Sequence, residues 1–112
     1  MNMSSRPSSP YKGMSVLEAF EKGFDPSGHA SGQFEGPGGV TVGVGTLRVL
    51  REIYDAGDQG RILPTNDIGL ASILASLRLV DFRGDVYLAN TRVLKYFILG
   101  DFRPTDPAHY NE

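Results

Sequence analysis

One stretch of the chain, residues 65–100, most limits what the protein can fold into. It reads TNDIGLASILASLRLVDFRGDVYLANTRVLKYFILG. Most of the large hydrophobic side chains lie here or in the short helical segment just before it. The pattern predicts an apolar helix, a tight two-stranded ribbon and a second amphipathic helix, in that order. Because a core can form here, we expect a small α+β domain.

The apolar helix begins with three residues that are all favourable helix caps, Thr65, Asn66 and Asp67. Polar side chains are scarce in the rest of it, so the helix is expected to be buried nearly all round. Gly69, Ser72 and Ser76 fall on one face at the spacing i, i+3, i+7 and form a small-residue stripe. Two interpretations remain open: a tight packing seam inside the fold, or a contact with a partner or with a second copy of the chain.

The ribbon and the closing helix follow. Residues 80–88 alternate around the turn 83–85, which predicts a β-hairpin. Asn90 or Thr91 then caps the helical segment RVLKYFIL, which Gly100 ends. Its expected inward-facing residues are Val93, Leu94, Phe97 and Ile98.

Upstream, Ser15 is the expected cap of a short helix over residues 15–22, and Gly23 ends that helix. The Gly-, Pro- and Ser-rich residues 24–39 predict a long loop. A short strand at 40–44 and a helix from 46 to 56, capped by Thr46, come next. Residues 61–63 are a candidate strand before Pro64.

Composition sets the domain boundaries. At 112 residues the chain is one domain at most. Residues 1–13 are predicted to be a disordered arm, 14–100 the folded domain and 101–112 a flexible acidic tail. No apolar run is long enough to span a membrane and no secretory signal is visible, so a cytoplasmic location is expected.

The sequence lacks the residues that thiol chemistry, a metal site or a dinucleotide-binding motif requires. There is no Cys, and His29 and His109 stand without a second ligand at metal spacing. The Gly43-Val44-Gly45 turn before a helix has Arg48 where a dinucleotide-binding motif needs its third glycine. We therefore expect no metal, no cofactor and no enzymatic activity.

Charge is spread unevenly over the chain, whose net charge is −2. Residues 46–100 carry seven Lys and Arg against six Asp and Glu, a balance of +1. Nucleic-acid-binding domains are usually clearly basic. The electrostatic signature of such a domain is faint here.

The order helix, strand, helix, helix, hairpin, helix resembles the winged helix-turn-helix family, best over residues 46–100. There, TLRVLREIYDAG looks like the opening helix of the family and VDFRGDVYLANTRVLKYF resembles its wing running into a closing helix. The resemblance implies an α+β fold of three to four helices and a hairpin. It also implies that Arg83, at the wing tip, touches the phosphate backbone of DNA, and that the helix from Asn66 lies in or near a groove.

Two functions follow as hypotheses. In the first, the protein is a DNA-binding or transcription-regulating protein, with Asn66 at a base edge and phosphate contacts from Arg78, Arg83, Arg92 and Lys95. In the second, the same scaffold binds protein as a homodimer, adaptor or inhibitor of the kind that phages and plasmids encode. The stripe of Gly69, Ser72 and Ser76 is then the partner interface.

Overall fold

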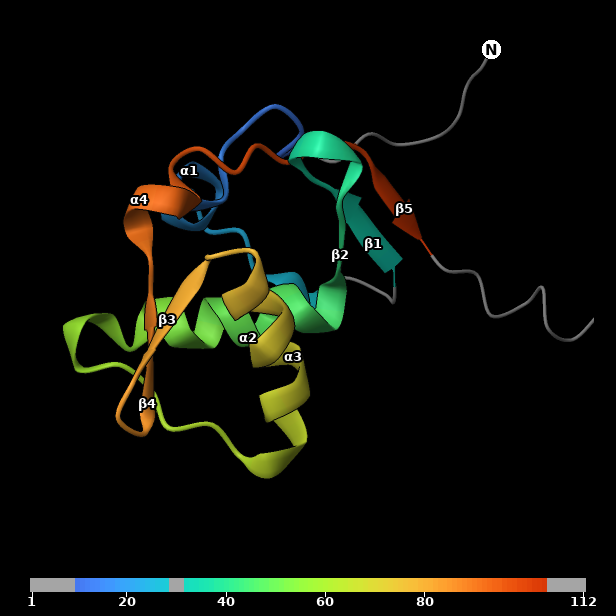
Figure 1. Cartoon of the computed structure of the whole chain (residues 1–112). Helices are drawn as coiled ribbons and strands as arrows, with labels where there is room; N and C mark the ends of the chain where they lie inside the picture. Colours follow the sequence, from blue (N-terminus) through green and yellow to red (C-terminus); the bar gives the residue numbers. More distant parts are fainter. Residues whose placement is uncertain (1–9, 29–31, 105–112) are drawn as a thin grey trace, which may run out of the picture.

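The computed structural model describes residues 10–28 and 32–104, and this part has a mixed α+β fold with four α-helices and two small antiparallel sheets (Figure 1). The helices are α1 (Val16–Glu21), α2 (Val44–Asp55), α3 (Thr65–Ser76) and α4 (Thr91–Leu94). The strands are β1 (Gly32–Glu35), β2 (Thr41–Gly43), β3 (Val80–Arg83), β4 (Val86–Ala89) and β5 (Phe102–Pro104). Three single 3₁₀ turns lie at Pro26–Gly28, Pro37–Gly39 and Gly57–Gln59. The expected α+β class is confirmed.

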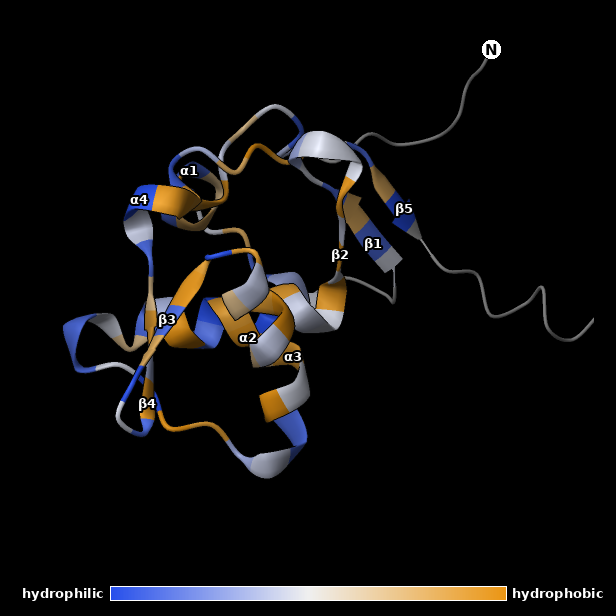
Figure 2. Ribbon diagram, viewed as in Figure 1, coloured by the Kyte–Doolittle hydropathy of each residue, from blue (hydrophilic) through white to orange (hydrophobic). Residues whose placement is uncertain are grey.

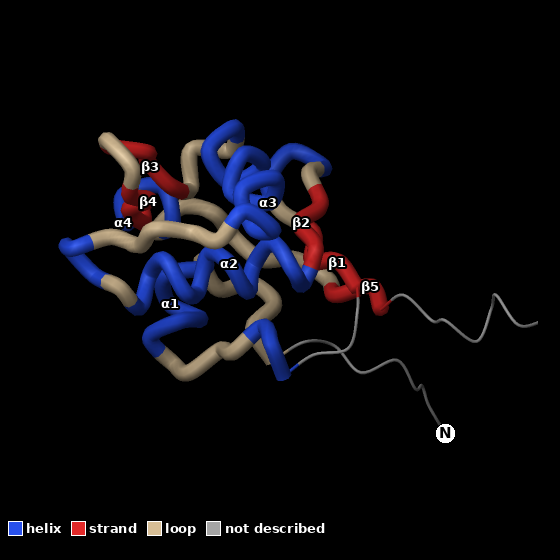
Figure 3. Tube along the Cα trace, turned by 90° about the horizontal axis from the view of Figure 1, so that it is seen from below, coloured by secondary structure: helices blue, strands red, loops and turns tan. Residues whose placement is uncertain are grey.

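Helix α2 lies at the centre of the domain, between α1 on one side and α3 on the other (Figure 3). Hydrophobic and hydrophilic residues alternate along it (Figure 2), and Leu47, Leu50 and Ile53 are fully buried. Apolar residues spaced three or four apart fall on one face of a helix, which is why the sequence predicts a helix here.

The start of α2 differs from the prediction. Gly43 is the N-cap, and Thr46 lies inside the first turn, with only 5% of its surface exposed. Strand β2 (Thr41–Gly43) passes directly into the helix, and Gly43 is both the last residue of the strand and the N-cap of the helix. The predicted strand at 40–44 and the helix after it are therefore both present, with the boundary two residues earlier.

Helix α1 begins as predicted. The Ser15 hydroxyl accepts a hydrogen bond from the Glu18 backbone N–H at 3.1 Å, which satisfies one of the free N–H groups of the first turn. The chain leaves the helix through Gly23, whose φ of 96° is readily adopted only by glycine. The helix has six residues, too few to be stable without tertiary contacts.

The prediction of one long loop over residues 24–39 is wrong, because the segment contains β1. This strand is the middle one of a three-stranded sheet ordered β2-β1-β5. Its anchor is Phe34, fully buried with its ring 5.4 Å from that of Phe24 and 4.7 Å from that of Phe102. Because the contacts that hold this strand come from residues distant in the sequence, the local sequence pattern gives little indication of it.

Both predicted flexible ends overlap the folded part. Tyr11 packs its ring 4.6 Å from the ring of Phe24, so the predicted arm ends before residue 13. Lys12 pairs with Asp101 at 2.9 Å, and the hydrogen bond to this carboxylate raises the pKa of the lysine above its ordinary value. Strand β5 takes up Phe102–Pro104, so the predicted tail starts too early. The rest of the arm and tail, residues 1–9 and 105–112, lies outside the described residues.

The predicted closing helix is also too long. The Asn90 side chain caps α4 by accepting from the Val93 N–H at 3.3 Å, but the helix ends at Leu94. After it, the backbone pairs with Ser15 and the first residue of α1, whose Val16 N–H donates to the Phe97 carbonyl at 2.9 Å. This pairing buries Phe97 and Leu99 and leaves the Ile98 residue, predicted to face inward, 44% exposed.

The predicted hairpin is confirmed as β3 and β4, joined by the two residues Gly84 and Asp85. Gly84 has a φ of 65°, in keeping with the glycine preference of two-residue hairpin turns. Arg61 pairs with Tyr87 on the outer edge of β4 through two reciprocal backbone hydrogen bonds of 2.8 Å. The candidate strand at 61–63 is thus reduced to a single bridge.

Candidate partner-binding face

The prediction that α3 is buried all round is wrong. Helix α2 and strand β3 pack against one side of it, where Ala71 and Leu74 are fully buried. On the other side Ile68 is 43% exposed and Ile73 46% exposed. An apolar sequence does not by itself bury a helix, because the fold must also provide elements for every side.

We call the exposed side of this helix the α3 face. It consists of Thr65, Asn66, Ile68, Gly69, Ser72, Ile73, Ala75 and Ser76. None of these side chains is charged, and Figure 2 shows α3 coloured as hydrophobic or intermediate over most of its length. A β-carbon added at Gly69 would have no atom of another described residue within 4 Å beyond its own helix backbone and chain neighbours. The small-residue stripe is therefore on the surface, and the interpretation as an internal packing seam is wrong.

The two serines of the α3 face already have hydrogen-bond partners inside the helix. The Ser72 hydroxyl donates to the Ile68 carbonyl at 3.1 Å, and the Ser76 hydroxyl donates to the Ile73 carbonyl at 2.7 Å. A hydroxyl whose proton is satisfied in this way loses little when water is removed from around it. The α3 face can therefore be covered at a low cost in desolvation.

Further apolar side chains are exposed on neighbouring elements. Ile62, before α3, is 65% exposed, and Phe82, on β3, is 56% exposed and packs its ring 4.6 Å from that of Tyr87. The hairpin and α3 lie on the same side of α2 (Figure 3). Exposed large apolar residues on adjacent elements are typical of an interaction surface. The exposure of Ile62 and Phe82 was not predicted from the sequence. Alternation and helix caps locate helices and strands, but they do not show which side of an element stays exposed when the domain folds.

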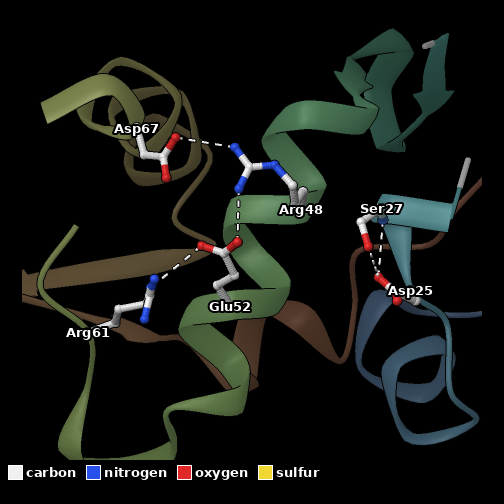
Figure 4. Close-up of polar contacts among 6 residues, drawn as sticks. All are labelled: Asp25, Ser27, Arg48, Glu52, Arg61 and Asp67. Carbon is white, nitrogen blue, oxygen red and sulfur yellow. Dashed lines mark hydrogen bonds and ion pairs between the residues drawn. The ribbon is translucent and has the colours of Figure 1, made fainter. Parts of the chain in front are cut away.

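A chain of ion pairs fixes the start of α3 to α2 (Figure 4). Arg48 donates to Glu52 at 2.8 Å and to Asp67 at 3.2 Å, and Glu52 in turn faces Arg61 at 3.5 Å. The hydrogen bond to Asp67 raises the pKa of Arg48 further above its ordinary value, so this guanidinium stays charged. Because the Asp67 side chain points toward α2 and is only 13% exposed, it adds no free charge to the α3 face.

A second polar contact in Figure 4 shapes the turn after α1. Asp25 accepts from the Ser27 backbone N–H at 3.1 Å and from its hydroxyl at 2.7 Å. Such side-chain turns are common where a chain reverses, and both residues are accounted for by local structure.

The basic residues predicted to contact DNA are all exposed: Arg78, Arg83, Arg92 and Lys95. None of them forms an ion pair with the described residues, although Lys95 lies 6.0 Å from the ring of Tyr96. Unpaired surface cations of this kind are free to meet an anionic ligand.

The structure does not bring these cations into one cluster. Arg83 ends β3 beside the hairpin turn, whereas Arg92 lies in α4, beyond the far end of β4. Arg78 follows α3, and Asn66 is exposed in the first turn of that helix, about 18 Å away along a helix of twelve residues. Asn66 and Arg78 thus lie at opposite ends of α3, and Arg83 and Arg92 lie at opposite ends of the hairpin.

We also searched residues 10–28 and 32–104 for a metal site, a pocket and a membrane-spanning helix. No group of three or more His, Cys, Asp or Glu there is placed to hold a metal ion, and His29 and His109 lie outside this part. A surface pocket of about 440 Å³ is lined by Tyr54, Asp55, Gly57, Asp58, Ala89 and Thr91. None of the helices described is both long and apolar enough to cross a membrane.

Comparisons of the chain with protein-family models, with curated proteins and with solved structures found no match.

Proposed function

We propose that this chain is a small non-enzymatic binding protein whose α3 face docks against another polypeptide. One observation carries the proposal: an exposed helix face that combines two large apolar side chains, Ile68 and Ile73, with small residues and no charge. Depletion of charge and exposure of large apolar groups are what the centre of a protein interface requires. The rigid attachment of α3 to α2 through Arg48 supports the same role, because a preformed face loses less entropy on binding.

The test compares the wild-type chain with two arginine variants as tagged bait, in extracts of cells that produce the protein. Ser72→Arg places a long charged side chain at the centre of the α3 face. Thr91→Arg is the matched control, since Thr91 is exposed on α4. We expect proteins captured by the wild type and by Thr91→Arg to be lost with Ser72→Arg, and an identical set for all three baits would contradict the proposal. Capture of untagged copies of the same chain by the bait is recorded separately from capture of other proteins.

A second candidate function is DNA binding. It is supported by four exposed cations that form no ion pair within residues 10–28 and 32–104, and by the layout of α2, α3 and hairpin, with Arg61 pairing beside β4. In a winged-helix mode of binding, α3 would approach a groove and Arg83 would touch the backbone. The uncharged α3 face favours the first function, because the main contacts to base edges come from Arg, Lys, Asn and Gln, of which this face offers Asn66 alone.

A further inference from the structure

The hairpin of β3 and β4 has two outer edges, and they differ in how they are paired. The edge of β4 is occupied, because Tyr87 exchanges two backbone hydrogen bonds of 2.8 Å with Arg61. Within residues 10–28 and 32–104, no backbone group on the outer edge of β3 has such a partner. Neither a proline nor a bulge blocks this edge, so a further strand can join the sheet through β3.

The register of the hairpin shows which backbone groups the β3 edge offers. The Asn90 N–H donates to the Leu79 carbonyl at 2.9 Å, and bonded pairs alternate with non-bonded pairs along an antiparallel ladder. Counting along the strand, Val80 and Phe82 direct their N–H and C=O groups away from β4. A donor and an acceptor on alternate residues of an extended strand match the backbone of another extended strand.

The side chains along this edge have a distinctive order: acid, aromatic, base. Phe82 is 56% exposed, and its ring lies 4.6 Å from that of Tyr87, directly opposite on β4. Asp81 and Arg83 on either side of Phe82 are exposed and form no ion pair with the part of the chain that the structure describes. Reversed in direction, this order of charges is its own complement.

We propose that β3 pairs edge to edge with β3 of a second copy of the chain, antiparallel about a two-fold axis at Phe82. The two Phe82 residues exchange reciprocal backbone hydrogen bonds, and each Asp81 lies directly opposite Arg83 of the other copy. The Phe82 and Tyr87 rings of both copies then form one row on a single face of the combined sheet. This pairing goes beyond the proposed function, because it does not use the α3 face.

The charges select both the register and the occupant. Registers that keep Phe82 in the bonded ladder differ by two residues. The neighbouring register on one side places Asp81 opposite its own image, and the one on the other side does the same for Arg83. Like charges directly opposite each other are destabilising, so both neighbouring registers are disfavoured. A foreign strand meets the same repulsion unless it carries the same order of charges, which β3 itself does.

The chain contains this order a second time, in the segment Asp101-Phe102-Arg103. That segment is already used within the fold. Its strand, β5, pairs with β1, while Asp101 binds Lys12 at 2.9 Å and Arg103 binds Glu35 at 2.6 Å. Among the described residues, β3 is therefore the segment that remains to complement the β3 edge of another copy.

Charge reversal tests the pairing through the molar mass in solution, measured by sedimentation over a wide range of concentrations. Asp81→Arg and Arg83→Asp each place like charges opposite each other in both side-chain contacts. We expect each variant to raise the dimer dissociation constant by roughly tenfold or more. In an equimolar mixture of the two variants every Arg again faces an Asp, so dimers should return as mixed pairs. Arg92→Asp makes the same change of charge at an exposed residue away from the edge, and it should dimerise like the wild type.

The outcomes that would overturn the proposal are equally specific. They are a wild type that stays monomeric throughout, a reversal variant that dimerises like the wild type, and a mixture that is no more dimeric than its components. Circular dichroism checks that each variant is folded. Asp81 and Arg83 lie opposite Leu88 and Val86 on β4, so neither reversal meets a like charge within its own hairpin.

A second measurement tests the register without reversing any charge. The chain has no cysteine, so Asp81→Cys and Arg83→Cys each introduce a sole thiol. In the proposed register these two residues face each other in a non-bonded pair, with α-carbons about 4.5 Å apart, which suits a disulfide. Two copies of the same variant hold their thiols roughly 8 Å apart, which is too far. Under mild oxidation of an equimolar mixture, mass spectrometry should find mainly the mixed disulfide. A statistical distribution of the three dimers would contradict the pairing.

Discussion

Arg51 on α2 holds the end of α1 through Phe20. Its guanidinium lies 5.1 Å from the centre of the Phe20 ring, while Nη1 donates to the Phe20 carbonyl at 2.9 Å. The same nitrogen donates to the Phe24 carbonyl at 3.1 Å. Carbonyls at the C-terminal end of a helix carry a partial negative charge, so a cation from another element is well placed to bind them.

Replacing this cation should destabilise the domain. In Arg51→Met both carbonyls lose the guanidinium as a donor, whereas the Phe20 carbonyl keeps the hydrogen bond from the Gly23 N–H at 3.0 Å and most of the apolar packing is kept. Charged hydrogen bonds and cation–π contacts of this kind contribute roughly 2–3 kcal/mol to the free energy of unfolding. Urea denaturation followed by circular dichroism measures the loss. Arg92→Met is the control, since Arg92 is exposed and forms no ion pair with the part of the chain that the structure describes, and it should change the value by less than about 0.5 kcal/mol. Equal effects of the two substitutions would show that Arg51 has no such role.

Arg78 should be replaceable with a gain in stability. It follows α3 with a φ of 64°, and the Leu79 N–H donates to the Leu74 carbonyl at 2.9 Å, which is the pattern of a helix ending that prefers glycine. Arg78→Gly removes the strain of a β-carbon in this conformation and should raise the free energy of unfolding by about 0.5–1 kcal/mol. Arg83→Gly, in a strand, should lower it by a similar amount. A loss of stability on Arg78→Gly in urea denaturation would contradict this assignment.

Gly36 should not tolerate a side chain. A β-carbon there would lie 2.5 Å from the ring of Phe97, which is nearly buried. Gly36→Ala must displace that ring and should cost about 1–3 kcal/mol of the free energy of unfolding. In Gly45→Ala the nearest side-chain atom would be 4.0 Å away, in Leu70, and the residue is helical, so stability should be unchanged or slightly higher. Thermal melts of the two variants compare them directly, and similar melting temperatures would be evidence against the close contact.

DNA binding makes a separate prediction, measured by fluorescence anisotropy with a random-sequence duplex at low and moderate salt. If the second candidate function holds, Arg83→Ala and Arg92→Ala each weaken binding and reduce the slope of log K against log salt by about 1. Lys22→Ala is the control, since Lys22 is exposed beyond the end of α1, outside the predicted set. If the wild type does not bind DNA at low salt, this function is ruled out. Equal weakening by all three variants would indicate non-specific electrostatic binding rather than binding through the surface that carries Arg83 and Arg92.

Local signals in the sequence predicted the elements that depend on local interactions. The cap at Ser15, the apolar stripe of α2 and the glycine turn at Gly84 all act within a few residues, and each is found where it was expected. The elements that were missed depend on distant partners. Strand β1 is defined by Phe34 between two aromatic rings, one of them 68 positions further along, in Phe102.

The site could be predicted only in part. Gly69, Ser72 and Ser76 share one face because helical spacing requires it, and that much was visible. Whether the face is covered depends on which elements pack around α3, and composition carries no information on this. The same limit explains Ile98, which the helical period placed inside but which an extended backbone turns outward.

The position of β1 has a consequence during synthesis of the chain. Its partners are β2, just after it, and β5, which contains Phe102. The central strand of this sheet therefore leaves the ribosome long before one of its neighbours, and one edge of β1 stays unpaired until residues 102–104 have been added. Contacts between distant segments form slowly, and exposed strand edges attract other chains in the meantime. We expect nascent chains stopped before residue 102 to aggregate more readily than the released protein.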